Sequence, residues 1–157
     1  MTSPTKTKPV VTTSRAVWRG DRLFDAGPEG RTVVVDGGSR TGPGPVETFL
    51  ASLASCSGVD ILDILAKQRT PAERFEVRVA ATRRPEAPRR VQRLELEYHI
   101  HGPGIEQEQA ERAIQLSFEK YCSVGASLAP DIVVEATLVL RGQRFPSRQL
   151  TIWRAAI

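Results

Sequence analysis

The sequence contains few of the residues that build disulfide frameworks, metal sites or base-stacking surfaces. Its 157 residues include two cysteines, two histidines, two tryptophans and two tyrosines. Cys56 and Cys122 lie too far apart for a CxxC motif, which excludes zinc ribbons and thioredoxin-like motifs. His99 and His101 share the polar side of a predicted strand, and no third ligand is suggested. We therefore expect no metal site.

Long apolar runs are also missing. No segment approaches 18 consecutive apolar residues, so we expect no membrane partner. The N-terminal stretch MTSPTKTKPVVTTSR lacks the apolar segment of a secretory signal. We predict a flexible tail over residues 1–14, a single domain over residues 15–157, and a cytoplasmic location in which cysteines are thiols at rest.

The net charge is moderately positive, and the basic residues are not concentrated in one segment. The net charge is +4, and the densest basic segment is TRRPEAPRRVQR, residues 82–93. Two prolines interrupt this segment, and it has no aromatic residue on which a base could stack. We interpret it as a solvated turn and expect no nucleic-acid partner.

The periodicity of apolar residues predicts an α+β fold with grouped strands. Two or three short strands precede a long helix, which begins after Pro45 and ends before the Thr70-Pro71 pair. Strict alternation predicts two strands joined as a hairpin, then a second helix and a final strand. The expected ranges are 46–68 for the long helix, 74–82 and 93–101 for the hairpin, 102–122 for the second helix and 132–140 for the last strand.

Each cysteine admits two interpretations when it is taken alone. The helix around Cys56 is apolar on nearly all sides, which is typical of a helix at the centre of a fold or between subunits. A cysteine in such a helix is more often a small packed residue than a nucleophile. Cys122 ends the second predicted helix and could likewise face the core.

The contexts of the two cysteines together resemble a known family. The segment PVETFLASLASCSGVDILDIL resembles the first cysteine helix of the OsmC/Ohr superfamily, and ERAIQLSFEKYCSV resembles the second cysteine helix of its OsmC-like branch. The resemblance covers roughly residues 15–140. It implies an OsmC-like fold and an intertwined homodimer in which the long helices of two subunits pack together.

The resemblance also implies an activity, that of a thiol peroxidase acting on organic or other hydroperoxides without a cofactor. Cys56 would attack the peroxide as a thiolate and become a sulfenic acid. Cys122 would then condense with it to a disulfide, which a dithiol reductant reopens. Peroxidases of the superfamily support the thiolate with an arginine and a glutamate. Glu47 matches the glutamate, Arg19 is the first choice for the arginine, and Arg31 is the second.

These activating residues have ordinary interpretations too. Glu47 precedes Cys56 by about 13 Å of straight helix, so the two cannot touch within one helix, and Glu47 would also be favourable simply as a charge at a helix N-terminus. Arg19, Arg31 and a third candidate, Arg40, could each be a surface charge. Asp60 lies one turn after Cys56, where an unpaired carboxylate would disfavour a thiolate. We therefore expect Asp60 to be bonded across the helix pair or to an arginine.

Two other functions stay open at this point. The same dimer could hold a small hydrophobic ligand in its interfacial cleft without catalysis, or the cysteines could be inert parts of the core.

Overall fold

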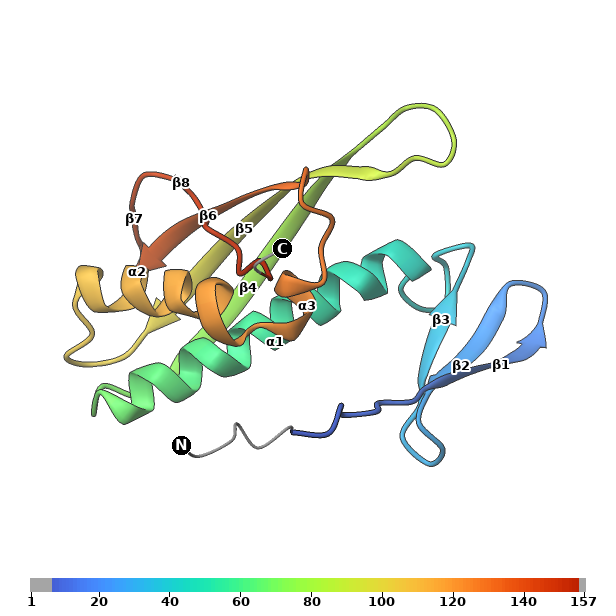
Figure 1. Ribbon diagram of the computed structural model, residues 1–157, viewed down its shortest axis with the longest axis horizontal. Helices are drawn as coiled ribbons and strands as arrows, with labels where there is room; N and C mark the ends of the chain where they lie inside the picture. The colour runs from blue at the N-terminus through green and yellow to red at the C-terminus, as the bar shows by residue number, and fades with distance from the viewer. Residues whose placement is uncertain (1–6, 156–157) are drawn as a thin grey trace, which may run out of the picture. The chain divides into compact units, whose positions relative to one another are not determined.

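A computed structural model describes residues 7–155 (Figure 1). Contacts divide the chain into two compact units, the first ending at Thr48 and the second beginning at Phe49. Residues 7–14 are exposed and form neither helix nor strand, and the rest of the predicted tail, residues 1–6, lies outside the described residues. The predicted single domain over residues 15–157 stays a prediction.

The first unit is a three-stranded antiparallel sheet in the order β1-β2-β3. The tight turn between the first two strands places Gly20 at φ 107° and Asp21 at φ 46°, a left-handed conformation that glycine and aspartate tolerate best. After the third strand, the Asp36 carboxylate accepts backbone hydrogen bonds from Gly38, Arg40 and Thr41 at 2.7–3.0 Å. These bonds fix the loop that leads into the long helix. The strands are β1 Arg15–Gly20, β2 Leu23–Gly27 and β3 Val33–Asp36.

The long helix α1 spans Pro45–Lys67, within one residue of the prediction at each end. Proline suits the first turn of a helix because its missing N–H would have no partner there. The helix buries one face against the core, and the residues of that face recur at helical spacing. They are Leu53, Ser57, Gly58, Ile61 and Leu65.

Among the described residues, α1 alone is long and apolar enough to cross a membrane by length and composition, with a mean hydropathy of 1.6. Core helices share that composition. Here Leu53, Ile61 and Leu65 join one hydrophobic cluster with the sheet of the second unit. These contacts are those of a core helix.

The second unit contains a sheet in the order β4-β5-β6-β7, with β8 also paired to β6. The predicted hairpin is confirmed, since β4 and β5 are antiparallel. The strand β6, in contrast, runs parallel to β5. The strands are β4 Arg74–Arg83, β5 Val91–His101, β6 Val133–Leu140, β7 Gln143–Arg144 and β8 Arg148–Gln149.

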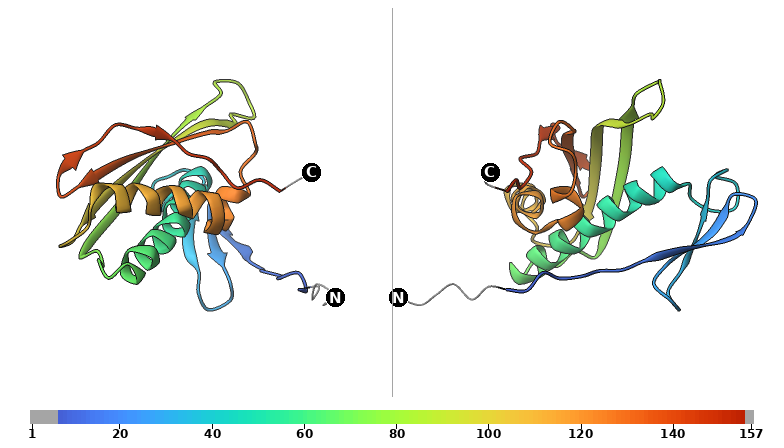
Figure 2. Two further views of the ribbon diagram at one scale, coloured as in Figure 1. Left: turned by 60° about the vertical axis from the view of Figure 1, so that its left-hand side comes forward. Right: turned by 45° about the vertical axis from the view of Figure 1, so that its right-hand side comes forward.

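The helices α1 and α2 (Gln107–Leu116) cover the same face of the sheet, as Figure 1 and both views of Figure 2 show. The alternation of β5 explains this arrangement because its even-numbered residues from 94 to 100 are buried and its glutamates face away. The buried residues of β5 are Leu94, Leu96, Tyr98 and Ile100. The core therefore lies between the sheet and the helix pair.

The second helix differs in detail from the prediction. The helix α2 spans only Gln107–Leu116 and begins with a capping box of Glu106 and Gln109. One π-helical turn, η1 Ser117–Tyr121, follows, and then the short helix α3 Ser123–Ala126. Cys122 thus lies at the break between two helical segments instead of within a regular helix.

The C-terminal segment, for which the sequence predicted no structure, folds back onto the second unit. Its two short strands β7 and β8 pair with β6. Further along, the Trp153 N–H donates to the carbonyl oxygen of Phe118 at 2.9 Å. The segment therefore completes the sheet edge and contacts η1.

Candidate functional site

The fold brings the two cysteines of the chain together. Cys56 lies at the middle of α1 and is half-buried, whereas Cys122 follows η1 and is buried. The Cys56 thiol lies within hydrogen-bonding reach of the Cys122 sulfur. Both are free thiols in this structure. We call the two cysteines, with Ser57, Tyr98, Asp60 and Ser117, the cysteine cluster; all six belong to the second unit.

The break in the helix gives Cys122 two backbone bonds. Its N–H donates to the carbonyl oxygen of Ser117 at 2.8 Å, which closes the π turn. Its sulfur accepts a hydrogen bond from the Gly125 N–H at 3.2 Å. Single π turns are often found at functional sites. Here the turn fixes the position of a thiol.

The surroundings of Cys122 favour the neutral thiol. Burial raises the pKa of Cys122 to about 12, although the Gly125 N–H opposes the shift. The hydrogen bond that the Cys122 thiol donates to the Cys56 sulfur, and the electrostatic effects of Cys56 and Asp60, raise the pKa further. Cys122 is therefore protonated at neutral pH.

Asp60 forms a hydrogen bond with Ser117 of the second helical region, and no arginine bonds to it among the described residues. Ser117 Oγ donates to Asp60 Oδ2 at 2.8 Å, and Ser117 has no exposed surface. Ser117 thus links the Asp60 carboxylate, through its hydroxyl, to the Cys122 N–H, through its carbonyl. The helical period of the sequence places Ser117 on an apolar helix face and gives no sign of this polar contact.

Ser57 of α1 and Tyr98 of β5 form a second polar pair in the cysteine cluster. The hydroxyls of Ser57 and Tyr98 lie 2.8 Å apart, and both residues are buried. Burial raises the pKa of the Tyr98 hydroxyl, the hydrogen bond from Ser57 opposes the shift, and the charges of Cys122 and Asp60 add to it. Tyr98 is therefore a neutral hydrogen-bonding group next to the cysteines.

Glu47 lies at the start of α1, in the first unit. Its Oε2 accepts a hydrogen bond from the Gly44 N–H at 2.7 Å and one from Ser39 Oγ at 3.3 Å. A carboxylate here satisfies an N–H at the helix N-terminus and is favoured by the helix dipole. A role of Glu47 toward Cys56 stays a prediction.

The arginine candidates also belong to the first unit. Arg19 forms an ion pair with Asp25 at 3.2 Å, and Arg40 forms one with Asp21 at 3.2 Å. Within the described residues, Arg31 forms no ion pair within 4 Å, and its N–H donates to the Pro28 carbonyl. Activation of Cys56 by one of these arginines stays a prediction.

Two cavities of the second unit lie near the helices. A cavity of about 270 Å³ has Asp60 in its wall, together with Asp63, Ile64, Lys67, Gln68, Leu116 and Tyr121. Solvent can therefore reach the Asp60 side of the cysteine cluster.

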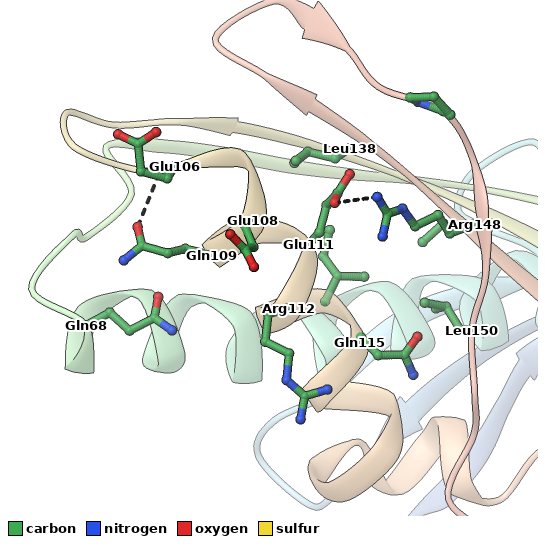
Figure 3. A pocket seen from close by; sticks show the side chains of 13 residues that line it. Gln68, Glu106, Glu108, Gln109, Glu111, Arg112, Gln115, Leu138, Arg148 and Leu150 are labelled. Atoms are coloured by element: carbon green, nitrogen blue, oxygen red, sulfur yellow. Dashed lines mark hydrogen bonds and ion pairs between the residues drawn. The ribbon is translucent and has the colours of Figure 1, made fainter.

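A larger groove of about 640 Å³ lies between α2 and the C-terminal segment (Figure 3). Glu111 and Arg148 form an ion pair at 2.9 Å across it, beside Leu138 and Leu150. No residue of the cysteine cluster lines this groove.

Comparisons with known proteins agree with this architecture. Residues 37–137 match the family model described as OsmC-like protein. Protein YhfA of Escherichia coli K12 is 33% identical over 117 residues, which cover 73% of this chain and 87% of that protein.

Solved structures are similar in fold. A hypothetical protein of Aquifex aeolicus has a TM-score of 0.76 at 26% identity, covering 85% of this chain and 98% of that one. The organic hydroperoxide resistance protein OhrB of Bacillus subtilis has a TM-score of 0.56 at 18% identity, covering 81% and 98%. The resemblance inferred from the two cysteine segments is thereby confirmed, and the chain belongs to the OsmC-like protein family.

Proposed function

We propose that the chain is a cysteine-dependent redox protein that reduces organic hydroperoxides. The single observation that carries the proposal is the meeting of Cys56 and Cys122, which come from distant parts of the sequence and lie within hydrogen-bonding reach. Membership of the OsmC-like family supports a redox role, and the fold shared with OhrB, a protein named for organic hydroperoxide resistance, is consistent with it.

The chemistry requires two steps at the cysteines. The Cys56 thiolate attacks the peroxide oxygen, the O–O bond breaks, and Cys56 becomes a sulfenic acid while the alkoxide takes a proton and leaves as an alcohol. Cys122 then attacks the Cys56 sulfur, and a disulfide and water form. A dithiol reductant returns both cysteines to thiols.

The different surroundings of the cysteines support this division of roles. Cys56 is half-buried, so a small peroxide can approach it. Cys122 is buried and its pKa is raised to about 12, so it is a poor first nucleophile. Cys122 is, however, placed to attack a sulfur that is already beside it.

Cysteine substitutions test the proposal. With cumene hydroperoxide and an excess of dithiol, the wild-type protein should consume peroxide catalytically. The Cys56→Ser variant should fall to the background rate, and Cys122→Ser should form a sulfenic acid at residue 56 that a 1,3-dicarbonyl reagent traps. If wild-type protein and Cys56→Ser consume peroxide equally, the proposal fails, and the rival function, retention of a small hydrophobic ligand without turnover, gains support.

We also propose that the protein is a homodimer through the outer face of α1. A shallow apolar groove of about 420 Å³ runs between α1 and β4, and its lining includes Gly58, Val59, Leu62 and Phe75. Val59 is 58% exposed and Leu62 is 37% exposed, although both lie in the most apolar helix of the chain. Burial of such a face against a second copy removes apolar surface from water.

The oligomeric state tests the dimer. Val59→Glu places a charge in the groove and should convert a dimer to a monomer, as analytical ultracentrifugation would detect. Lys67→Glu changes charge on the same helix outside the groove and should leave the dimer intact. A wild-type protein that sediments as a monomer at tens of micromolar would contradict this proposal.

A further inference from the structure

Asp60 is the carboxylate of the cysteine cluster, and the structure holds it in place. The Ser117 hydroxyl donates to Asp60 Oδ2 at 2.8 Å from a position with no exposed surface. The carbonyl of the same serine accepts the Cys122 N–H at 2.8 Å. Asp60 follows Cys56 by about one turn on the same face of α1, and its charge raises the pKa of both Cys122 and Tyr98.

Disulfide formation needs a group that removes a proton from Cys122. Only a thiolate attacks sulfur efficiently. With its pKa at about 12, only about one Cys122 in 10⁵ is ionised at pH 7. A route through spontaneous ionisation would therefore be slow, and a general base that accepts the proton during the attack would lower this barrier.

We propose that Asp60 receives the proton of the Cys122 thiol as Cys122 attacks oxidised Cys56, and that Ser117 positions the Asp60 carboxylate for this transfer. The inference rests on the proposed peroxidase function. As the sulfur–sulfur bond forms, the sulfur–oxygen bond of the Cys56 sulfenic acid breaks. The departing hydroxide takes the proton from the Asp60 carboxylic acid, and the products are the disulfide and water.

The cavity beside Asp60 fits this role. Its wall contains Asp60 and Asp63, about one turn apart on α1, together with Leu116 and Tyr121 from the second helical region. Water formed in the step can leave through it. Asp63 is exposed and shares the cavity, which makes it a matched carboxylate for comparison.

The substitution Asp60→Asn distinguishes a role of Asp60 as proton acceptor from an effect of its negative charge alone. An asparagine oxygen can still accept the Ser117 hydrogen bond, so the local packing is kept. If Asp60 acted only through its negative charge, its removal would lower the pKa of Cys122 and make disulfide formation faster. If Asp60 accepts the proton, disulfide formation at pH 7 should slow about 100-fold.

The pH profile supplies a second readout. In the wild-type protein, the rate of disulfide formation after one equivalent of hydroperoxide should change little between pH 6 and 8, because the base is already present. In Asp60→Asn, that rate should rise about tenfold per pH unit, because it follows the ionised fraction of Cys122. Trapping of the Cys56 sulfenic acid should be higher in Asp60→Asn than in the wild-type protein, and highest at low pH, because the sulfenic acid persists longer when the disulfide forms slowly. Asp63→Asn should behave as wild type, and Ser117→Ala should lie between the two.

A reaction that needs no peroxide makes the outcome independent of the proposed function. An aromatic disulfide such as 5,5′-dithiobis(2-nitrobenzoate) exchanges with Cys56, and attack by Cys122 then releases a second equivalent of coloured thiolate. Asp60→Asn should slow this second release. If the release depends on Asp60 but peroxide leaves Cys56 unoxidised, the peroxidase proposal fails and the inference on Asp60 stands. A rate in Asp60→Asn that equals or exceeds the wild-type rate, with the wild-type pH profile, would overturn it.

Discussion

The two cysteines lie side by side, but they come from opposite kinds of backbone. Cys56 belongs to an uninterrupted helix, in which every nearby N–H and carbonyl is already used in helical hydrogen bonds. Cys122 lies between a π turn and α3, so the Gly125 N–H is free to bond its sulfur. The helix break therefore leaves a backbone N–H that can bind the Cys122 sulfur. A regular helix leaves no such N–H for Cys56.

The surroundings of Cys122 also explain why this buried thiol needs a base in order to react. The bond from Gly125 favours the Cys122 thiolate, but burial outweighs it and raises the pKa of Cys122 to about 12. Precise placement and low intrinsic reactivity are thus combined in one residue. Such a thiol suits the second step of the proposed reaction, in which its target, the sulfur of oxidised Cys56, already lies within reach.

The largest expected effect of this contrast is a difference in alkylation. At pH 8, with a pKa of about 12, about one Cys122 in 10⁴ is a thiolate, against about a quarter of an ordinary exposed thiol. In the Cys56→Ser variant burial, the largest cause of the raised pKa, still acts on Cys122 while the contributions of Cys56 are gone, so we expect iodoacetamide to modify Cys122 at least about 100-fold more slowly than a small model thiol. Peptide mass spectrometry measures both rates.

The pH dependence of this alkylation has a definite sign. Because the folded-state pKa is raised, the rate at Cys122 should increase about tenfold per pH unit up to about pH 11, as long as the protein stays folded. The Cys122→Ser variant, which keeps Cys56, is the matched control and should be modified faster. Equal rates for the two variants at pH 8 would remove the distinction between the cysteines.

The elements around Cys56 were accessible from sequence because their signals are local. Pro45 and the Thr70-Pro71 pair mark the ends of α1, and strict alternation marks β4 and β5. The two cysteine segments identified the family, which in turn predicted that the cysteines meet. None of these inferences required knowledge of distant pairings.

The elements around Cys122 were less accessible. The apolar pattern of residues 110–121 continues with a helical period, so it conceals the π turn. The extra residue in that turn rotates the later side chains about the helix axis. A regular helical period would place Tyr121 on the same face as Ala110 and Ala113, but Tyr121 is 48% exposed. The bond between Ser117 and Asp60 joins distant parts of the chain, and the strands β7 and β8 have two residues each, too few for a periodic signal.

A smaller effect tests whether the two cysteine environments also differ in packing. A glycine lies shortly after each cysteine in the sequence, Gly58 in α1 and Gly125 in α3. A Cβ atom at Gly125 would lie 3.0 and 3.1 Å from two ring carbons of Phe118 and 3.3 Å from the Cys122 sulfur. Since Phe118 is buried without exposed surface, its ring has little room to move. We expect Gly125→Ala to reduce the free energy of unfolding by about 1–3 kcal/mol.

Gly58→Ala is the matched substitution beside Cys56. Its Cβ would lie 3.2 Å from one ring carbon of Phe75, which is only partly buried and can shift. Alanine also favours the interior of a long helix over glycine by about 1 kcal/mol. The two contributions have opposite signs, so the net change should be within about 1 kcal/mol of zero by urea denaturation. If Gly125→Ala were as stable as Gly58→Ala, the Cys122 side would have spare volume, and its sulfur would then owe its position to hydrogen bonds alone.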